Sequence, residues 1–520
     1  MRKRLLLIGL AAGIVMTAAV PSSAVIPGVG VIHKKNMEWV WNVPQAVGSD
    51  LEFFEQKQED GSLKRYAVTG SMGNGFNVID ITDPTLPVLA GSFVTPGLSW
   101  QGDIQINAKR ELVVLSIQSP GTNGEMGGQG IMIVDISDPT SPILRSTVNG
   151  LSAHNSTIIS DTAIYVSDKT IVDYSDPDNP VNKGKWNAFC GIHDITLDPN
   201  NQDVAYFACP SRTIDIWDVS DPFSPVLLSR TTDNGIATAH ESDPSPDSSL
   251  LFVTDERGGG LSNANAPGGG LHVYDISGKH SEPDADGPAS LTNPIKVGFY
   301  IVPFHGLATS DTQAGPWGNV TSHVTTFQAE RHLLSVAWYT MGSWVADLQY
   351  PTNHTGPYQE WSGNQFGNGP TTWGNTQGGI ILEGDEVWSS KWTAFDDPVF
   401  DRYLFTNGLT RGMDVIRYTG SMPQKVARLA VDDAATDGAV TGVLDRYAVW
   451  TYEGWVNKPL AGKSVKVKVD GGPSATVTTG ADGSFSADLG LGAGSHDVTV
   501  SWTDVSGVYQ TASQTLTVTA

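Results

Sequence analysis

The chain has 520 residues, of which 39% are hydrophobic and 17% charged, with 57 glycines and 30 prolines. This composition favours many short strands joined by tight turns, and no segment after residue 24 shows sustained helical periodicity. A formal net charge of −24 at pH 7 repels phosphate backbones and anionic headgroups, so nucleic acid is excluded as an expected partner.

The first 24 residues have the three regions of a secretory signal peptide. Residues 2–4 are basic, residues 5–20 are apolar, and Ser22 and Ala24 are small residues at the positions that precede a cleavage site. We expect cleavage after Ala24 and a mature protein that is secreted, extracellular or cell-surface associated, without a membrane span. An uncleaved anchor is the alternative, although the apolar run is short for a bilayer span.

Four segments of the chain are near copies of one another. Each has two apolar residues, an Asp, two further residues, Asp-Pro-x-x-Pro and another apolar residue: VIDITDPTLPV (78–88), IVDISDPTSPI (133–143), IVDYSDPDNPV (171–181) and IWDVSDPFSPV (216–226). The apolar run is typical of a buried strand. The second Asp of each copy is expected to bond a backbone amide two residues on, in a turn that the next Pro fixes. These turn residues are Asp83, Asp138, Asp176 and Asp221.

Weaker copies of the repeat follow at 273–279, 345–351 and 415–421. Strand-like runs before and after the copies give four strands per repeat. This pattern predicts an all-β fold with a seven-bladed β-propeller over residues 36–422. The segment MEWVWNV (37–43) lies outside the repeats and is a candidate closing strand for the last blade. The four strong copies resemble the LVIVD-repeat family of secreted propellers, which implies the fold but little about function.

The composition changes near residue 424 to alternating Val, Thr, Ala and Gly. The runs SVKVKVDGG, ATVTTGADGSFSADLG and SHDVTVSW are typical of strands with one buried face, separated by glycine-rich turns. Residues 424–520 resemble a bacterial Ig-like module, chiefly in the hairpin TTGADGSFSADL. The resemblance implies a small Ig-like β-sandwich that acts as a spacer or adhesive unit.

The two cysteines, Cys190 and Cys209, lie at the ends of a predicted hairpin, CGIHDITLDPNNQDVAYFAC. Its two strands, joined by the DPNN turn, bring the cysteines nearly opposite each other. An exported protein also meets an oxidising environment. We therefore expect a disulfide between them, the alternative being two unpaired buried thiols.

Four of the 11 histidines open the first predicted strand of four consecutive repeats: His154, His193, His240 and His323. The first strand of each propeller blade lines the central channel, so equivalent positions meet at one end of it. Neutral imidazoles that converge there would suit one transition metal ion, such as copper, iron or zinc. Asp194 and Glu241, which follow two of these histidines, are candidates for orienting the rings through hydrogen bonds. The alternative is four structural histidines bonded to separate groups.

A long insertion at 351–377 carries Tyr358, Trp361 and Trp373 among Gly, Asn and Gln residues. Aromatic and amide side chains on loops suit an extracellular protein, peptide or carbohydrate ligand, the alternative being a loop folded over its own blade. Phosphate-binding loops, nucleophile elbows and zinc-protease motifs are absent from the sequence. Two functions remain open. One is a secreted or cell-surface binding protein built on the propeller, and the other is a metal-dependent enzyme, an oxidoreductase, that uses the histidines.

Overall fold

The computed structural model describes residues 30–94, 101–118, 129–188, 190–256, 269–302, 320–348, 375–432, 439–451 and 454–519. Nearly all regular structure in these residues is β-strand. The described helices are short 3-10 turns: η1 (Ala108–Arg110), η3 (Ala329–Arg331) and η4 (Phe400–Arg402). The all-β prediction is confirmed. None of the helices in these ranges is long and apolar enough to cross a membrane.

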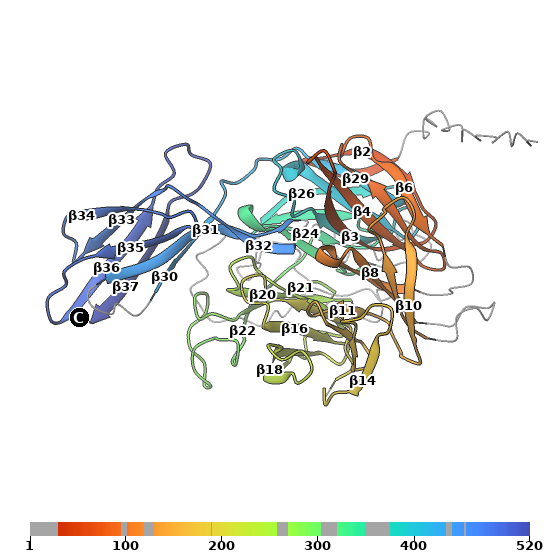
Figure 1. Ribbon diagram of the computed structural model, residues 1–520, viewed down its shortest axis with the longest axis horizontal. Helices are drawn as coiled ribbons and strands as arrows, with labels where there is room; N and C mark the ends of the chain where they lie inside the picture. The colour runs from red at the N-terminus through yellow and green to blue at the C-terminus, as the bar shows by residue number, and fades with distance from the viewer. Residues whose placement is uncertain are drawn as a thin grey trace, which may run out of the picture.

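Seven antiparallel sheets, numbered 1 to 7 in chain order, are formed by the described residues between 31 and 418 (Figure 1). Sheet 1 contains β3 (Gly48–Lys57), β4 (Leu63–Ser71), β5 (Gly75–Asp80) and β6 (Val88–Phe93). Sheet 2 contains β7 (Gln101–Asn107), β8 (Leu112–Ile117), β9 (Gly130–Asp135) and β10 (Ile143–Asn149). Sheet 3 contains β11 (Ser156–Ile158), β12 (Ala163–Val166), β13 (Thr170–Asp173) and β14 (Val181–Lys185).

The remaining sheets repeat this order of strands. Sheet 4 contains β15 (Asp194–Leu197), β16 (Val204–Cys209), β17 (Thr213–Asp218) and β18 (Val226–Thr232). Sheet 5 contains β19 (Ala239–Pro244), β20 (Leu250–Asp255), β21 (Leu271–Asp275) and β22 (Ile295–Tyr300). Sheet 6 contains β23 (Thr325–Gln328), β24 (Leu333–Ala337), β25 (Ser343–Asp347), β26 (Asn375–Leu382) and β1 (Val31–Lys35). Sheet 7 contains β27 (Val387–Trp392), β28 (Tyr403–Gly408), β29 (Gly412–Tyr418) and β2 (Met37–Pro44).

The first strands of the seven sheets contact one another in a closed circuit, so the seven sheets together form a ring. The contacts run from β3 through β7, β11, β15, β19, β23 and β27 and back to β3. Strands that surround a common centre in this way are expected of propeller blades, so the arrangement agrees with a propeller, and the count of seven blades stays a prediction. The predicted closing strand is confirmed, because β2 pairs antiparallel with β29 and joins the N-terminal segment to sheet 7. The sequence did not indicate β1, which pairs with β26 as a fifth strand of sheet 6.

The Asp-Pro turns have the structure that the repeat predicts. Asp83 Oδ1 accepts hydrogen bonds from the backbone N and Oγ1 of Thr85, at 2.9 and 2.6 Å. The other three repeats form the same amide bond, to the carboxylates of Asp138, Asp176 and Asp221. The turns also contact the preceding sheet, since Ser146 Oγ of β10 donates to the carbonyl of Pro177 at 2.6 Å. They therefore act both as local turns and as contacts between neighbouring sheets.

The C-terminal part of the chain forms two further sheets. One contains β30 (Ala427–Val431), β31 (Ala439–Thr451), β32 (Gly454–Pro459) and β35 (Ser484–Asp488). The other contains β33 (Ser464–Val469), β34 (Ser474–Thr478), β36 (Ser495–Trp502) and β37 (Ala512–Thr519). The two sheets share one hydrophobic core that includes Val465, Val498 and Trp502. Two sheets around one core agree with the sandwich, and the Ig-like assignment stays a prediction.

The C-terminal unit lies to one side of the seven sheets (Figure 1), and polar contacts join it to them. Glu330 of η3 lies 2.5 Å from Lys425 Nζ and 3.4 Å from Arg446 Nη1, and it accepts a hydrogen bond of 3.0 Å from the Tyr509 hydroxyl. Arg446 also pairs with Asp396, at 2.8 Å. Strand β31 contacts both η3 and β3. The unit is therefore docked on the ring by charged groups while it keeps its own core.

Candidate metal centre

The four histidines predicted to bind a metal lie at the start of four consecutive first strands. His154 and His323 precede β11 and β23 by two residues, His193 directly precedes β15, and His240 is the second residue of β19. The backbone N–H groups of His193 and His323 donate to carbonyls of residues in or next to the second strand, at 2.8 and 3.0 Å. The histidines therefore occupy corresponding places in sheets 3 to 6, as the repeat predicts.

The four imidazole rings form a continuous row. Their centroids are separated by 4.6 Å from His154 to His193, by 4.1 Å from His193 to His240, and by 3.9 Å from His240 to His323. The Nε2 atoms of His154 and His193 lie 3.2 Å apart. Two nitrogens bound to a tetrahedral zinc at roughly 2.0–2.1 Å would be about 3.3 Å apart. The spacing of this pair therefore suits a shared metal ion.

Three ring nitrogens in this row are buried without a hydrogen-bond partner in the described chain: His193 Nδ1, His240 Nδ1 and His323 Nε2. His323 shows why. Its Nδ1 lies 2.7 Å from the carbonyl oxygen of Trp388, which can only accept, so Nδ1 carries the hydrogen and a neutral ring presents a bare Nε2. A buried nitrogen without a partner loses its hydration, which a metal ion could restore at His323 Nε2. At His193 the nitrogen that faces Glu256 is Nε2 rather than the partnerless Nδ1.

Burial keeps these rings neutral, which is the form that ligates a metal. It lowers the pKa of His154, and it lowers the pKa of His323 to about 3. It also holds the pKa values of His193 and His240 well below the usual value. For these last two, the neighbouring histidines lower the pKa further, because adjacent imidazolium charges would repel each other.

A carboxylate that the sequence analysis did not single out completes the cluster. Glu256 directly follows β20, and its Oε2 lies 3.8 Å from His193 Nε2. In this cluster, each of three residues offers one ligand atom, and these atoms lie within 4.8 Å of one another: His193, His240 and Glu256. Burial raises the pKa of Glu256, and its Oε1 accepts a hydrogen bond of 2.7 Å from the Tyr339 hydroxyl. Two imidazoles and one carboxylate form a donor set that zinc and non-haem iron use in catalytic sites.

The cluster adjoins a cavity of about 680 Å³ at the centre of the ring, and all seven first strands contribute residues to its wall. Among them, Lys391 of β27 lies 3.0 Å from Asp50 Oδ2 and 2.8 Å from Glu52 Oε1. Burial and the charge of Asp50 raise the pKa of Asp103 well above its usual value. The cavity is therefore lined by polar groups, of which several carboxyls favour the neutral form.

Asp194 and Glu241 line this cavity, but the expected bonds to the imidazoles are not found among the described residues. Asp194 Oδ1 accepts from the backbone N of Ile195 at 2.7 Å, and Glu241 Oε2 accepts from the backbone N of Thr325 at 2.6 Å. Burial raises the pKa of Asp194 to about 8. These carboxyls belong to the cavity wall rather than to the support of the histidines.

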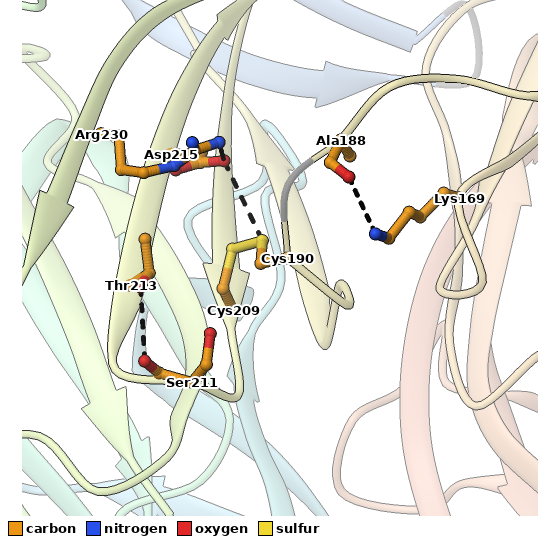
Figure 2. Close-up of a disulfide and its surroundings, with 8 residues drawn as sticks. All are labelled: Lys169, Ala188, Cys190, Cys209, Ser211, Thr213, Asp215 and Arg230. Atoms are coloured by element: carbon orange, nitrogen blue, oxygen red, sulfur yellow. Dashed lines mark hydrogen bonds and ion pairs between the residues drawn. A yellow bond between two sulfur atoms is a disulfide. The ribbon is translucent and has the colours of Figure 1, made fainter.

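The predicted disulfide joins Cys190 and Cys209, whose Cα atoms lie 5.8 Å apart (Figure 2). It ties the segment that enters β15, and with it His193, to the end of β16. Asp215 lies beside the bridge, but the bonded sulfurs cannot act as thiolate ligands. Asp215 instead accepts two hydrogen bonds of 2.8 Å from Arg230. The bridge therefore has a structural role at the segment that carries His193.

The outer surface of the ring carries exposed apolar residues at regular places. The first residues of the outer strands β6, β10, β14 and β18 are more than half exposed: Val88, Ile143, Val181 and Val226. These strands follow the four strong repeat motifs. The predicted ligand-loop aromatics Tyr358, Trp361 and Trp373 lie outside the described residues, as does the predicted signal peptide. Apolar side chains on four neighbouring outer strands could contribute to an interaction surface.

Comparison with known proteins supports the repeats identified in the sequence. The family model of the LVIVD repeat matches residues 65–95 and 126–150, so the chain contains LVIVD repeats as its motifs indicate. A crystal structure of a functionally unknown protein from Desulfotomaculum acetoxidans DSM 771 is 14% identical, covering 65% of this chain and 90% of that chain, with a TM-score of 0.38. No curated protein matches the chain.

Proposed function

We propose that this LVIVD-repeat protein is a metal-dependent protein that holds one divalent transition-metal ion with His193, His240 and Glu256. The observation that carries the proposal is the approach of these three groups, whose ligand atoms lie within 4.8 Å of one another. His154 flanks the set through its Nε2, 3.2 Å from His193 Nε2, and the ring of His323 flanks it on the other side, with its centroid 3.9 Å from that of His240.

The arrangement supports catalysis on a small molecule, and an oxidoreductase is the enzyme class that we propose. Three protein ligands leave coordination positions free, and the adjoining cavity of about 680 Å³ has room for a small substrate. An iron or copper ion would supply electron transfer, whereas zinc would polarise a carbonyl or activate water. The protein itself supplies neutral imidazoles, one carboxylate and a wall of polar groups that orient the substrate.

Elemental analysis of the protein purified without chelator tests this proposal. We expect about one transition-metal ion per chain, and a loss of affinity in His240→Ala that exceeds the roughly 10–100-fold typical of removing a supporting residue. His280→Ala is the matched control, because His280 is half-buried and its Nε2 lies 3.0 Å from Ser249 Oγ, away from the cavity wall. A wild-type protein that binds no zinc, iron or copper, or equal metal content in the two variants, would overturn the proposal.

A binding role outside the cell is the second candidate. The exposed apolar residues on β6, β10, β14 and β18 favour it, since they offer an interaction surface that does not involve the central cavity. The predicted signal peptide and the C-terminal unit agree with an exported protein that presents the ring to an extracellular protein, peptide or carbohydrate. Glycan and peptide arrays probed with the mature chain would identify such a ligand, and metal removal should not affect that binding.

A further inference from the structure

Tyr339 has a backbone conformation that few residues of its kind adopt. It lies in the turn between β24 and β25 with a φ of +45°, and it is only 1% exposed. Bulky residues at positive φ are strained and persist only where the surrounding structure fixes them. Here the carbonyl of Tyr339 accepts hydrogen bonds from Gly342 N at 2.9 Å and from Val387 N at 3.1 Å. The turn and the neighbouring sheet thus hold this tyrosine in one orientation.

That orientation aims the Tyr339 hydroxyl at the metal centre. The hydroxyl donates to Glu256 Oε1 at 2.7 Å, while the other carboxylate oxygen, Oε2, lies 3.8 Å from His193 Nε2. The tyrosine ring also packs on His323, with 4.7 Å between the ring centroids. One carboxylate oxygen is therefore engaged by a fixed donor, and the second faces the histidines.

The backbone of Glu256 is already fixed on both sides. Its N–H donates to the carbonyl of Thr238 at 3.0 Å, and its carbonyl accepts from Thr321 Oγ1 at 2.8 Å. Rotation about the side-chain bonds is the freedom that remains, and ordering a Glu side chain costs conformational entropy. A donor that restricts these rotations before the metal arrives removes that cost from the binding step.

We infer that Tyr339 is the positioning residue of this metal site, holding Glu256 Oε1 so that Oε2 is presented to an ion between His193 and His240. The inference rests on the proposed metal-binding function. It also gives a reason for the positive φ, because the strained turn directs the hydroxyl toward Glu256.

Metal affinity tests the inference directly. Tyr339→Phe keeps the ring and the backbone, so the fold should persist, as a far-UV circular dichroism spectrum will show. We expect zinc affinity, measured by competition with a chromogenic chelator, to fall roughly 10–100-fold. We also expect the visible absorption spectrum of the cobalt-substituted protein to change, because the carboxylate reorients. Tyr165→Phe is the matched control: Tyr165 is equally buried, and its hydroxyl donates to the carbonyl of Pro222 at 2.7 Å.

A double-mutant cycle distinguishes positioning from a merely structural effect. If Tyr339 acts through Glu256, then Tyr339→Phe should cause no further loss of zinc affinity in a Glu256→Ala background. Additive losses, or an unchanged affinity and cobalt spectrum in Tyr339→Phe, would overturn the inference while the metal site stands. A wild-type protein that binds neither zinc nor cobalt would instead remove the proposed function, and the inference with it.

Discussion

Replacing His323 by Asn should make the metal-free protein less sensitive to acid. Burial lowers the pKa of His323 to about 3, whereas an unfolded chain has a histidine pKa of about 6.5. Between these values the unfolded state binds a proton that the folded state does not, so the free energy of unfolding falls as the pH falls below 6.5. The contribution of His323 to the free energy of unfolding is fully present above pH 6.5, the histidine pKa of the unfolded chain, and is lost progressively as the pH falls to about 3.

The magnitude follows from the two pKa values. At about pH 4.5, two units below the unfolded pKa, the loss is about 3 kcal/mol, at 1.36 kcal/mol per unit. The variant His323→Asn lacks this titration but keeps an amide donor in the place of Nδ1, which bonds the carbonyl of Trp388 at 2.7 Å. Other titrating groups are common to both proteins and cancel in the comparison. The difference in unfolding free energy between pH 7 and about pH 4.5 should therefore be about 3 kcal/mol smaller in the variant.

Urea denaturation at several pH values, with a chelator present and tryptophan fluorescence as the signal, measures this difference. His496→Asn is an opposite control, because the pKa of His496 is raised by its bond to Asp470. Its contribution is present below pH 6.5 and is lost as the pH rises, so this variant should lose stability on the acid side. Parallel pH profiles for the wild type and His323→Asn would refute the reasoning, since they would mean that His323 titrates normally in the folded protein.

A chain ending at Met422 should still fold and melt cooperatively, because the C-terminal core draws only on residues after 426 and is joined to the ring by contacts such as Glu330–Lys425. Circular dichroism melts test this, and aggregation of the truncated chain would show that the C-terminal unit belongs to the ring's core. Peptide mapping without reduction should find the peptides of Cys190 and Cys209 linked. Cys209→Ser should lower the unfolding free energy by about 3 kcal/mol, as expected for a closed loop of about 20 residues, and an unchanged denaturation midpoint would contradict this.

The fold could be predicted from the sequence wherever its determinants are local and repeated. The bond from Thr85 to Asp83 spans two residues, and the same Asp-Pro turn recurs in four repeats, so the motif itself marks where each outer strand begins. The closing strand β2 could be predicted although it pairs with β29 at the other end of the ring, because 37–43 was strand-like and lay outside the repeats. Strand β1 could not be predicted, because this exposed five-residue edge strand shows no alternation of apolar and polar residues.

The proposed metal site could likewise be predicted only in part. The histidines could be placed together because each opens a first strand, and equivalent positions of a closed ring must converge. Glu256 and Tyr339 come from the end of a second strand and from a strained turn, and no repeat fixes either position. Asp194 and Glu241 adjoin histidines in the sequence, but their carboxylates accept hydrogen bonds from the backbone N–H groups of Ile195 and Thr325, which the sequence does not reveal.

The proposed metal site therefore depends on places where sheets 5 and 6 depart from the common pattern. The repeated backbone brings imidazoles into a row, but a row of neutral rings carries no charge to offset that of a divalent ion. Glu256 supplies one negative charge at the end of β20, and the turn around Tyr339 supplies the donor that orients it. The proposed site needs both parts, since the repeat provides convergence of the imidazoles and the irregular residues provide charge and orientation.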